Sequence, residues 1–116
     1  MAQYTYPGAG ELVPYAYENI TASTSSIGFT AATIVQSDGN PTRPRARRAK
    51  SAFVTVEAQS VRVRWDGGDP VAATSGHLLV AGDSIEFTGE GTLPKVRFIR
   101  EGGTDSTLRV TYARTA

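Results

Sequence analysis

The residues able to do chemistry are few, and the first of them is the single histidine, His77. It directly follows Ser75 and Gly76, and Asp83 lies a short distance beyond it. A serine hydrolase needs a nucleophile, a base and an orienting carboxylate, and the GxSxG pattern that presents such a nucleophile is absent. The sequence therefore predicts no catalytic residue and no enzyme, and we interpret His77 as a turn residue.

Two carboxylates in the segment DGGDP, Asp66 and Asp69, are candidate oxygen ligands for a calcium ion. Ca²⁺ takes about six to eight oxygen ligands, and the loop pattern of an EF-hand is missing. The chain has no cysteine, so thiolate ligands for zinc are excluded as well. Because Asp, Gly and Pro together are typical of turns, we expect a turn here, with no metal and no cofactor.

A basic cluster stands out in the segment PTRPRARRAK, residues 41–50. Arginine is the residue that best recognises carboxylate or phosphate in a bidentate manner, and it dominates this cluster. Contact with an acidic protein surface, contact with nucleic acid, and simple solvation remain open. No aromatic residue is interleaved to stack on bases, and a net charge of +1 gives no general attraction to nucleic acid. We favour a protein partner, and the predicted contact residues are Arg43, Arg45, Arg47, Arg48 and Lys50.

The first 19 residues have a composition of their own, rich in tyrosine, proline and glycine without a clear period. Proline removes backbone donors and glycine raises the entropic cost of order, so we predict an extended N-terminal arm over residues 1–19. Tyrosine suits a surface that becomes ordered against another molecule. The predicted partner-binding tyrosines are Tyr4, Tyr6, Tyr15 and Tyr17. The alternative, an arm that folds back on its own domain, is equally consistent with the sequence.

The rest of the chain, residues 20–116, reads as one β domain. Apolar and other residues alternate in AFVTVEA, VRVRW, SIEF, KVRFIR and TLRVTY, which indicates strands with one buried face. Two further short strands are expected within 20–36, an exposed basic loop at 37–50, and a tight hairpin turn at Gln59–Ser60. The fold class predicted is all-β, an antiparallel β-sandwich or jelly-roll-like barrel with the extended arm.

The same alternation predicts the aromatic core. It places Trp65, Phe87, Phe98 and Tyr112 on the inward faces of their strands, where each would bury a large apolar area. No window reaches the roughly 20 apolar residues that a membrane-spanning helix needs, and no signal peptide is recognisable. We therefore expect neither membrane insertion nor export.

The order VTVE, VRVRWDGGDP, GHLLVAGDSIEF, VRFIR and TLRVTY resembles small all-β structural proteins of tailed bacteriophages, over roughly residues 20–114. The resemblance implies a virion component, most simply a capsid decoration (cement) protein, made in the host cytoplasm. Implied partners are the major capsid protein or other virion subunits, with a homo-oligomer of this chain. Alternatives are a head–tail connector or tail component, and a carbohydrate- or receptor-binding β-sandwich module, in which an exposed Trp or Tyr would stack on sugar rings.

Overall fold

The structure is a computed structural model that describes residues 12–34 and 48–115. Within these ranges the chain forms strands, one turn of α-helix and one turn of 3-10 helix. None of the helices described has the length and apolar character needed to cross a membrane. In chain order the elements are β1 (Leu12–Ala22), α1 (Ala31–Ile34), β2 (Ser51–Glu57), β3 (Val61–Arg64), β4 (His77–Leu79), β5 (Ser84–Thr88), η1 (Leu93–Lys95), β6 (Arg97–Arg100) and β7 (Ser106–Thr115).

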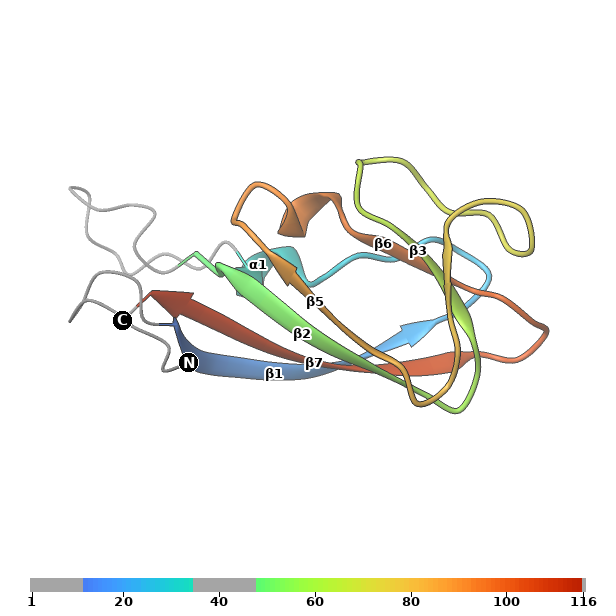
Figure 1. The fold of residues 1–116 in the computed structure, drawn as a ribbon, viewed down its shortest axis with the longest axis horizontal. Helices are drawn as coiled ribbons and strands as arrows, with labels where there is room; N and C mark the ends of the chain where they lie inside the picture. Colours follow the sequence, from blue (N-terminus) through green and yellow to red (C-terminus); the bar gives the residue numbers. More distant parts are fainter. Residues whose placement is uncertain (1–11, 35–47, 116) are drawn as a thin grey trace, which may run out of the picture.

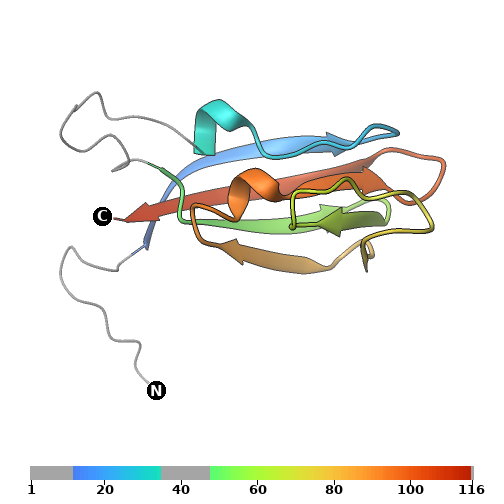
Figure 2. The same cartoon turned by 90° about the horizontal axis from the view of Figure 1, so that it is seen from above.

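The strands form two antiparallel sheets that pack face to face as a sandwich (Figures 1 and 2). The larger sheet has the order β1-β7-β2-β5, and the smaller has the order β4-β3-β6. The predicted fold class, an all-β antiparallel sandwich, is confirmed. The expected hairpin at Gln59–Ser60 is wrong, because β2 and β3 belong to different sheets. Ala58, with φ of 76°, turns the chain across, and the Ser106 hydroxyl donates to the Glu57 and Gln59 carbonyls at 2.8 and 2.7 Å.

The core lies between the two sheets and follows the predicted alternation. Phe98 and Tyr112 are completely buried, and Phe87 is nearly so. Phe29 joins them from the segment after β1, with edge-on ring contacts at 5.7 Å to Phe98 and 5.6 Å to Tyr112. Burial of each such ring stabilises the fold by about 1.5–3 kcal/mol, so this cluster closes the centre of the sandwich. Its aliphatic members include Val54, Val56, Val61, Val63, Leu108 and Val110.

The predicted arm is wrong for residues 12–19, which lie in β1 and pair with β7 along its whole length. Residues 1–11 lie outside the described part of the chain. Pro14 is tolerated because β1 is the edge strand of its sheet and its register shifts between Pro14 and Ala16. Proline in this stretch therefore marks a bulged edge strand and not an arm.

The stretch 20–36, predicted to hold two short strands, is mostly irregular where it is described. It contains the end of β1, a single β-bridge from Ile27 to Phe98, and α1. The bridge places this segment beside β6, where Ile27 and Phe98 exchange backbone hydrogen bonds of 2.9 and 2.7 Å. The segment therefore covers the β6 side of the core, which the smaller sheet alone would leave open.

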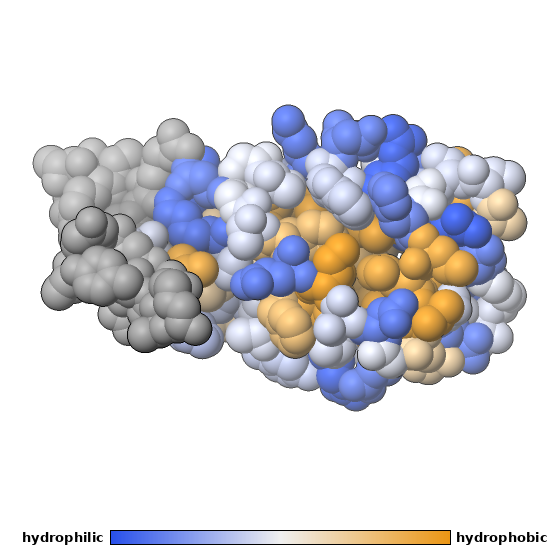
Figure 3. Space-filling model, viewed as in Figure 1, coloured by the Kyte–Doolittle hydropathy of each residue, from blue (hydrophilic) through white to orange (hydrophobic). Residues whose placement is uncertain are grey.

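The opposite flank, between β4 and β5, has no such cover among the described residues. β4 ends the smaller sheet and β5 ends the larger one, and the two are not paired. Figure 1 looks onto this flank, and Figure 3 shows apolar side chains gathered on it. Trp65, whose ring meets Phe87 of β5 at 5.5 Å, is 39% exposed here. An exposed apolar surface of this kind is typical of an interaction site.

Glu18 fastens the segment after β1 to the centre of the larger sheet. Its carboxylate accepts hydrogen bonds from the Thr30 amide at 3.2 Å and the Thr30 hydroxyl at 2.5 Å, and from the phenol of buried Tyr112. Burial, together with the neighbouring Glu18 carboxylate, raises the pKa of Tyr112 well above its usual value. The phenol therefore stays a neutral donor, and one carboxylate links β1, β7 and the segment that holds Phe29.

Replacing Tyr112 by Phe removes that donor while keeping the ring. We expect Y112F to lower the free energy of unfolding by about 2 kcal/mol, because a partly buried carboxylate loses a charge-assisted hydrogen bond. The matched control is Y17F, since the Tyr17 hydroxyl bonds Asn19 and Arg109 at the exposed surface and should change stability by about 0.5 kcal/mol or less. Urea denaturation measures the free energy of unfolding of both variants. Equal losses of stability would show that the hydrogen bond between Tyr112 and Glu18 does not stabilise the fold.

Candidate functional site

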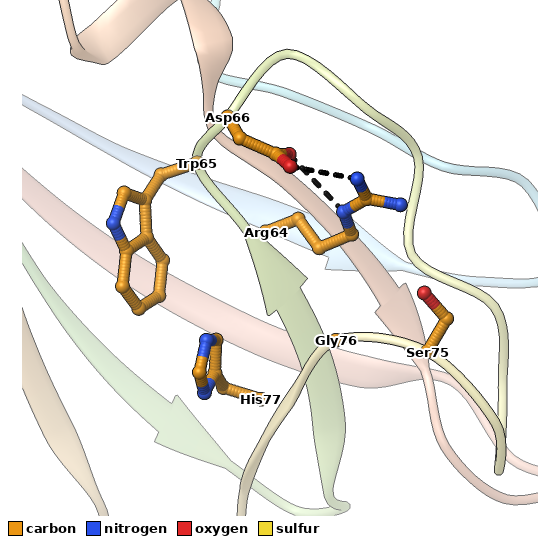
Figure 4. A pocket seen from close by; sticks show the side chains of 6 residues that line it. All are labelled: Arg64, Trp65, Asp66, Ser75, Gly76 and His77. Atoms are coloured by element: carbon orange, nitrogen blue, oxygen red, sulfur yellow. Dashed lines mark hydrogen bonds and ion pairs between the residues drawn. The ribbon is translucent and has the colours of Figure 1, made fainter.

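A cavity of about 330 Å³ lies where β3 and β4 diverge. Their pairing ends at Val63 and His77, and beyond this pair the two chains separate. The lining residues, shown in Figure 4, are Arg64, Trp65, Asp66, Ser75, Gly76 and His77. We call it the flank cavity, because it lies beside the uncovered edge of the sandwich.

Trp65 supplies the aromatic wall of the flank cavity. The alternation in VRVRW places it on the inward side of β3, but it is 39% exposed, so the prediction that it belongs to the core is wrong. The strand ends at Arg64, and Trp65 lies beyond it on the flank that no strand of the described residues covers. Its ring stacks on His77, with centroids 4.7 Å apart and planes 21° from parallel, and meets Phe87 at 5.5 Å.

The polar wall of the flank cavity is an ion pair. Arg64 Nε donates to Asp66 Oδ1 at 3.1 Å and Arg64 Nη2 donates to Asp66 Oδ2 at 2.7 Å. The amide of Gly68 also donates to Asp66 Oδ1, at 3.1 Å. These donors favour the ionised carboxylate, and they lower the pKa of Asp66 to about 2. Both charges are thus held in place before any ligand arrives.

The rest of the loop is fixed by internal contacts, as expected for a turn. Asp69 accepts from the Ser26 hydroxyl at 2.8 Å through its carboxylate and from Arg64 at 3.2 Å through its carbonyl. Gly76 adopts φ of +111°, and a Cβ there would lie 3.2 Å from the carbonyl oxygen of Val63. Glycine at 76 therefore lets the chain pass close to β3, which shapes this end of the cavity.

Neither chemical motif of the sequence forms a catalytic or metal constellation in the described residues. The carboxylate of Asp83 accepts the Val80 amide at 2.8 Å in a turn, while His77 packs its ring on Trp65. Residues 12–34 and 48–115 contain no group of three or more His, Asp or Glu side chains placed to hold a metal ion.

A second cavity, of about 290 Å³, shares Trp65 with the first and continues along β5. Its other lining residues are Ile85, Glu86, Phe87, Thr88 and Thr92. The indole of Trp65 thus separates two hollows on one flank. Sequence reasoning missed this site because the alternation gives the face of a residue but not what covers it, and the turn formers after Trp65 were the only sign that β3 ends there.

The predicted partner-binding residues fall into three groups: those outside the described residues, the two tyrosines of β1, and the two cations at the end of the basic loop. Tyr4, Tyr6, Arg43, Arg45 and Arg47 lie outside the described residues. The other two tyrosines lie on opposite faces of β1, because the register shift between Pro14 and Ala16 falls at Tyr15. Tyr15 packs against the core and donates its hydroxyl to the Thr33 carbonyl at 2.6 Å, with the Arg114 guanidinium 4.4 Å from its ring centroid. Tyr17 stands on the outer face, 57% exposed.

The end of the basic loop is attached to the sandwich, although the loop was predicted to be exposed as far as Lys50. Ala49 is buried, and the Lys50 ammonium pairs with Glu90. Arg48 is half-buried, and its Nε has no hydrogen-bond partner among the residues described. Neither side chain is fully exposed to solvent, because Lys50 is paired with Glu90 and Arg48 is half-buried.

The points at which residues 1–11 and 35–47 join the sandwich lie at one end of it, which we call the attachment end. Leu12 pairs with Thr115, and the Lys50 amide donates to the carbonyl of Ala113, two residues away, at 2.7 Å. Across the loop, the Ala49 amide donates to the Ile34 carbonyl at 2.9 Å. The described residues that adjoin the two segments predicted to contact a partner, the N-terminal segment and the basic loop, therefore lie close together.

Exposed apolar side chains continue from the attachment end onto the outer face of the larger sheet. Leu12 stands opposite Thr115, and Tyr17 and Phe53 stand on either side of Thr111 in one row across β1, β7 and β2. All three apolar residues are more than two-fifths exposed. This part of the sheet combines aromatic area with a polar surround, a composition found in protein interfaces.

No protein-family model, no curated protein and no solved structure matches this chain.

Proposed function

We propose that this protein is a non-enzymatic structural protein of a virion, a decoration or cement protein that binds a capsid shell and reinforces it. The observation that carries the proposal is the attachment end. The described residues that adjoin the tyrosine-rich N-terminal segment and the arginine-rich loop lie close together there. Leu12 pairs with Thr115 of β7, and Lys50, just before β2, bonds to Ala113 of the same strand. One docking event could therefore engage both segments.

The exposed row of Tyr17 and Phe53 adds a preformed surface beside these roots. Aromatic rings contribute large contact areas at low entropic cost, and they are enriched where protein interfaces are strongest. The arginine-rich loop would then pair with acidic groups of shell subunits, in keeping with the bidentate preference of guanidinium groups. The resemblance to small all-β phage proteins points in the same direction.

The mechanism would be passive. A homo-oligomer placed over a local symmetry axis of the shell contacts several capsid subunits at once, so that weak individual contacts combine through effective concentration. Each contact can then be modest while the shell as a whole is strongly reinforced. A head–tail connector or tail component would use the same surfaces in a single small ring.

Copurification with particles tests the proposal directly. We expect the chain to remain with virions of the virus that encodes it through a density gradient, at a copy number comparable with that of the capsid subunit. Quantitative mass spectrometry gives this number. A few copies per particle would indicate a connector or tail position, and absence from particles would contradict a virion role.

A truncated chain sharpens the test. Removing residues 1–11 leaves β1 intact, so the variant should keep the stability of the full chain, whereas a cut beyond Leu12 would remove the edge strand. Added back to particles that lack the protein, the truncated chain should bind more weakly than the full chain in a sedimentation assay. Undiminished binding would exclude residues 1–11 from the interface.

The basic loop gives an independent variant. The triple change R43S/R45S/R47S should weaken attachment by about tenfold or more at low ionic strength, with a smaller effect at high salt. Arg48 is kept, because its Nε is buried and its replacement would disturb packing. The matched control R43K/R45K/R47K keeps the charge and should retain more binding than the serine variant. Equal binding by all three proteins at low salt would show that the loop does not contact the shell.

A further inference from the structure

The uncovered flank holds a site that the role in assembly does not use. We propose that the flank cavity binds a saccharide, with one sugar ring against Trp65 and its hydroxyl groups hydrogen-bonded to the polar wall. The proposal concerns a free glycan and not a virion subunit, so it goes beyond the decoration role.

The aromatic wall of the flank cavity suits the apolar face of a sugar ring. A pyranose ring presents an apolar face of C–H groups together with a rim of hydroxyls, and a partly exposed indole offers an apolar surface for those C–H groups. Trp65 is the single tryptophan of the chain, yet it is 39% exposed on a flank where burial would have stabilised the fold. His77 stacks on it, and Phe87 packs against it from the core side. These two contacts hold the indole in one orientation, and the part of it that they do not cover is exposed.

The polar wall of the flank cavity suits the hydroxyl groups of a sugar. The Asp66 carboxylate accepts from Arg64 Nε, Arg64 Nη2 and the Gly68 amide, which fix its orientation. Its side chain is still 62% exposed, so a sugar hydroxyl can reach the carboxylate oxygens from the solvent side. The hydroxyl of Ser75 adds a donor–acceptor to the same cavity. Figure 4 shows the two rings on one side of the cavity and the ion pair and Ser75 on the other.

The site is also rigid enough to bind a small ligand. The loop between β3 and β4 is held by the bridge from Val71 to Ser75, and the Ala73 amide donates to Glu101 at 2.8 Å. Glu101 in turn pairs with Arg62 on β3. Few groups therefore need to be ordered on binding, which lowers its entropic cost.

Size and charge narrow the ligand class. A volume of about 330 Å³ lies at the lower end of the range for small-molecule pockets, about 300–1,000 Å³, and suits one or two sugar rings. Asp66 and Arg64 neutralise one another, so the cavity offers no surplus positive charge for a phosphate or a nucleotide. A neutral, hydroxyl-rich ligand fits best.

The test titrates the full chain with D-glucose, D-galactose, N-acetylglucosamine and their β-1,4-linked disaccharides. We expect at least one of them to shift the Trp65 indole N–H and the Gly76 amide in ¹H–¹⁵N spectra, with Kd on the order of 1 mM for a single ring. Shifts confined to other residues, or no shift with any sugar up to about 50 mM, would overturn the proposal.

Variants separate recognition from folding. W65A should weaken binding by about tenfold or more, and D66N, which keeps the shape of the side chain, should weaken it by a smaller factor. F53A is the matched control, because Phe53 is an exposed aromatic residue on the outer face of the other sheet and its loss should leave sugar binding unchanged. If W65A does not fold, D66N alone decides.

Two results would contradict a saccharide site in the flank cavity. One is an indole shift that depends on protein concentration without sugar, which would indicate a second copy of the chain. The other is sugar binding that F53A abolishes while D66N leaves it intact. Neither result depends on particles, so the outcome is independent of the decoration role.

Discussion

The structure depends on the mismatch between a four-stranded sheet and the three-stranded sheet that packs on it. The smaller sheet cannot cover the larger one, so each flank needs another cover or stays open. On the β6 side, the segment after β1 supplies Phe29 to the core and is fastened by Glu18 to Thr30 and Tyr112. On the β4 side the described residues supply no cover. The core residue Phe87 contacts the ring of Trp65 there, and Trp65 is partly exposed.

This asymmetry gives the molecule two surfaces with different chemistry. The attachment end brings together the roots of two segments with Tyr17 and Phe53 nearby, a combination suited to other protein subunits. The flank cavity combines one aromatic wall with a fixed pair of opposite charges, a combination suited to a small polar ligand. In our two proposals, the attachment end binds a capsid shell and the flank cavity binds a glycan.

Much of the fold could be predicted from period-two alternation, because a half-buried strand must place apolar side chains on one face. Val54, Val56, Leu108 and Val110 are buried as that pattern requires. Partner strands are not encoded locally, so the sequence predicts a hairpin at Gln59–Ser60 where the chain in fact crosses from β2 to the other sheet at Ala58. Proline and glycine near β1 had suggested an arm, because a bulged edge strand tolerates the same residues. Trp65 was placed on the correct face, but its exposure depends on the uncovered β4–β5 edge, which no local pattern reports.

The central claim, that the sandwich leaves the β4–β5 flank open, is tested most directly by the fluorescence of the single tryptophan. In the full chain we predict emission to the red of that of a buried indole and clear quenching by iodide, with a quenching constant below that of the chain unfolded in urea, because Trp65 is 39% exposed. Blue-shifted emission that iodide barely quenches would show that the flank is covered, and it would contradict both the open edge and the cavity beside it.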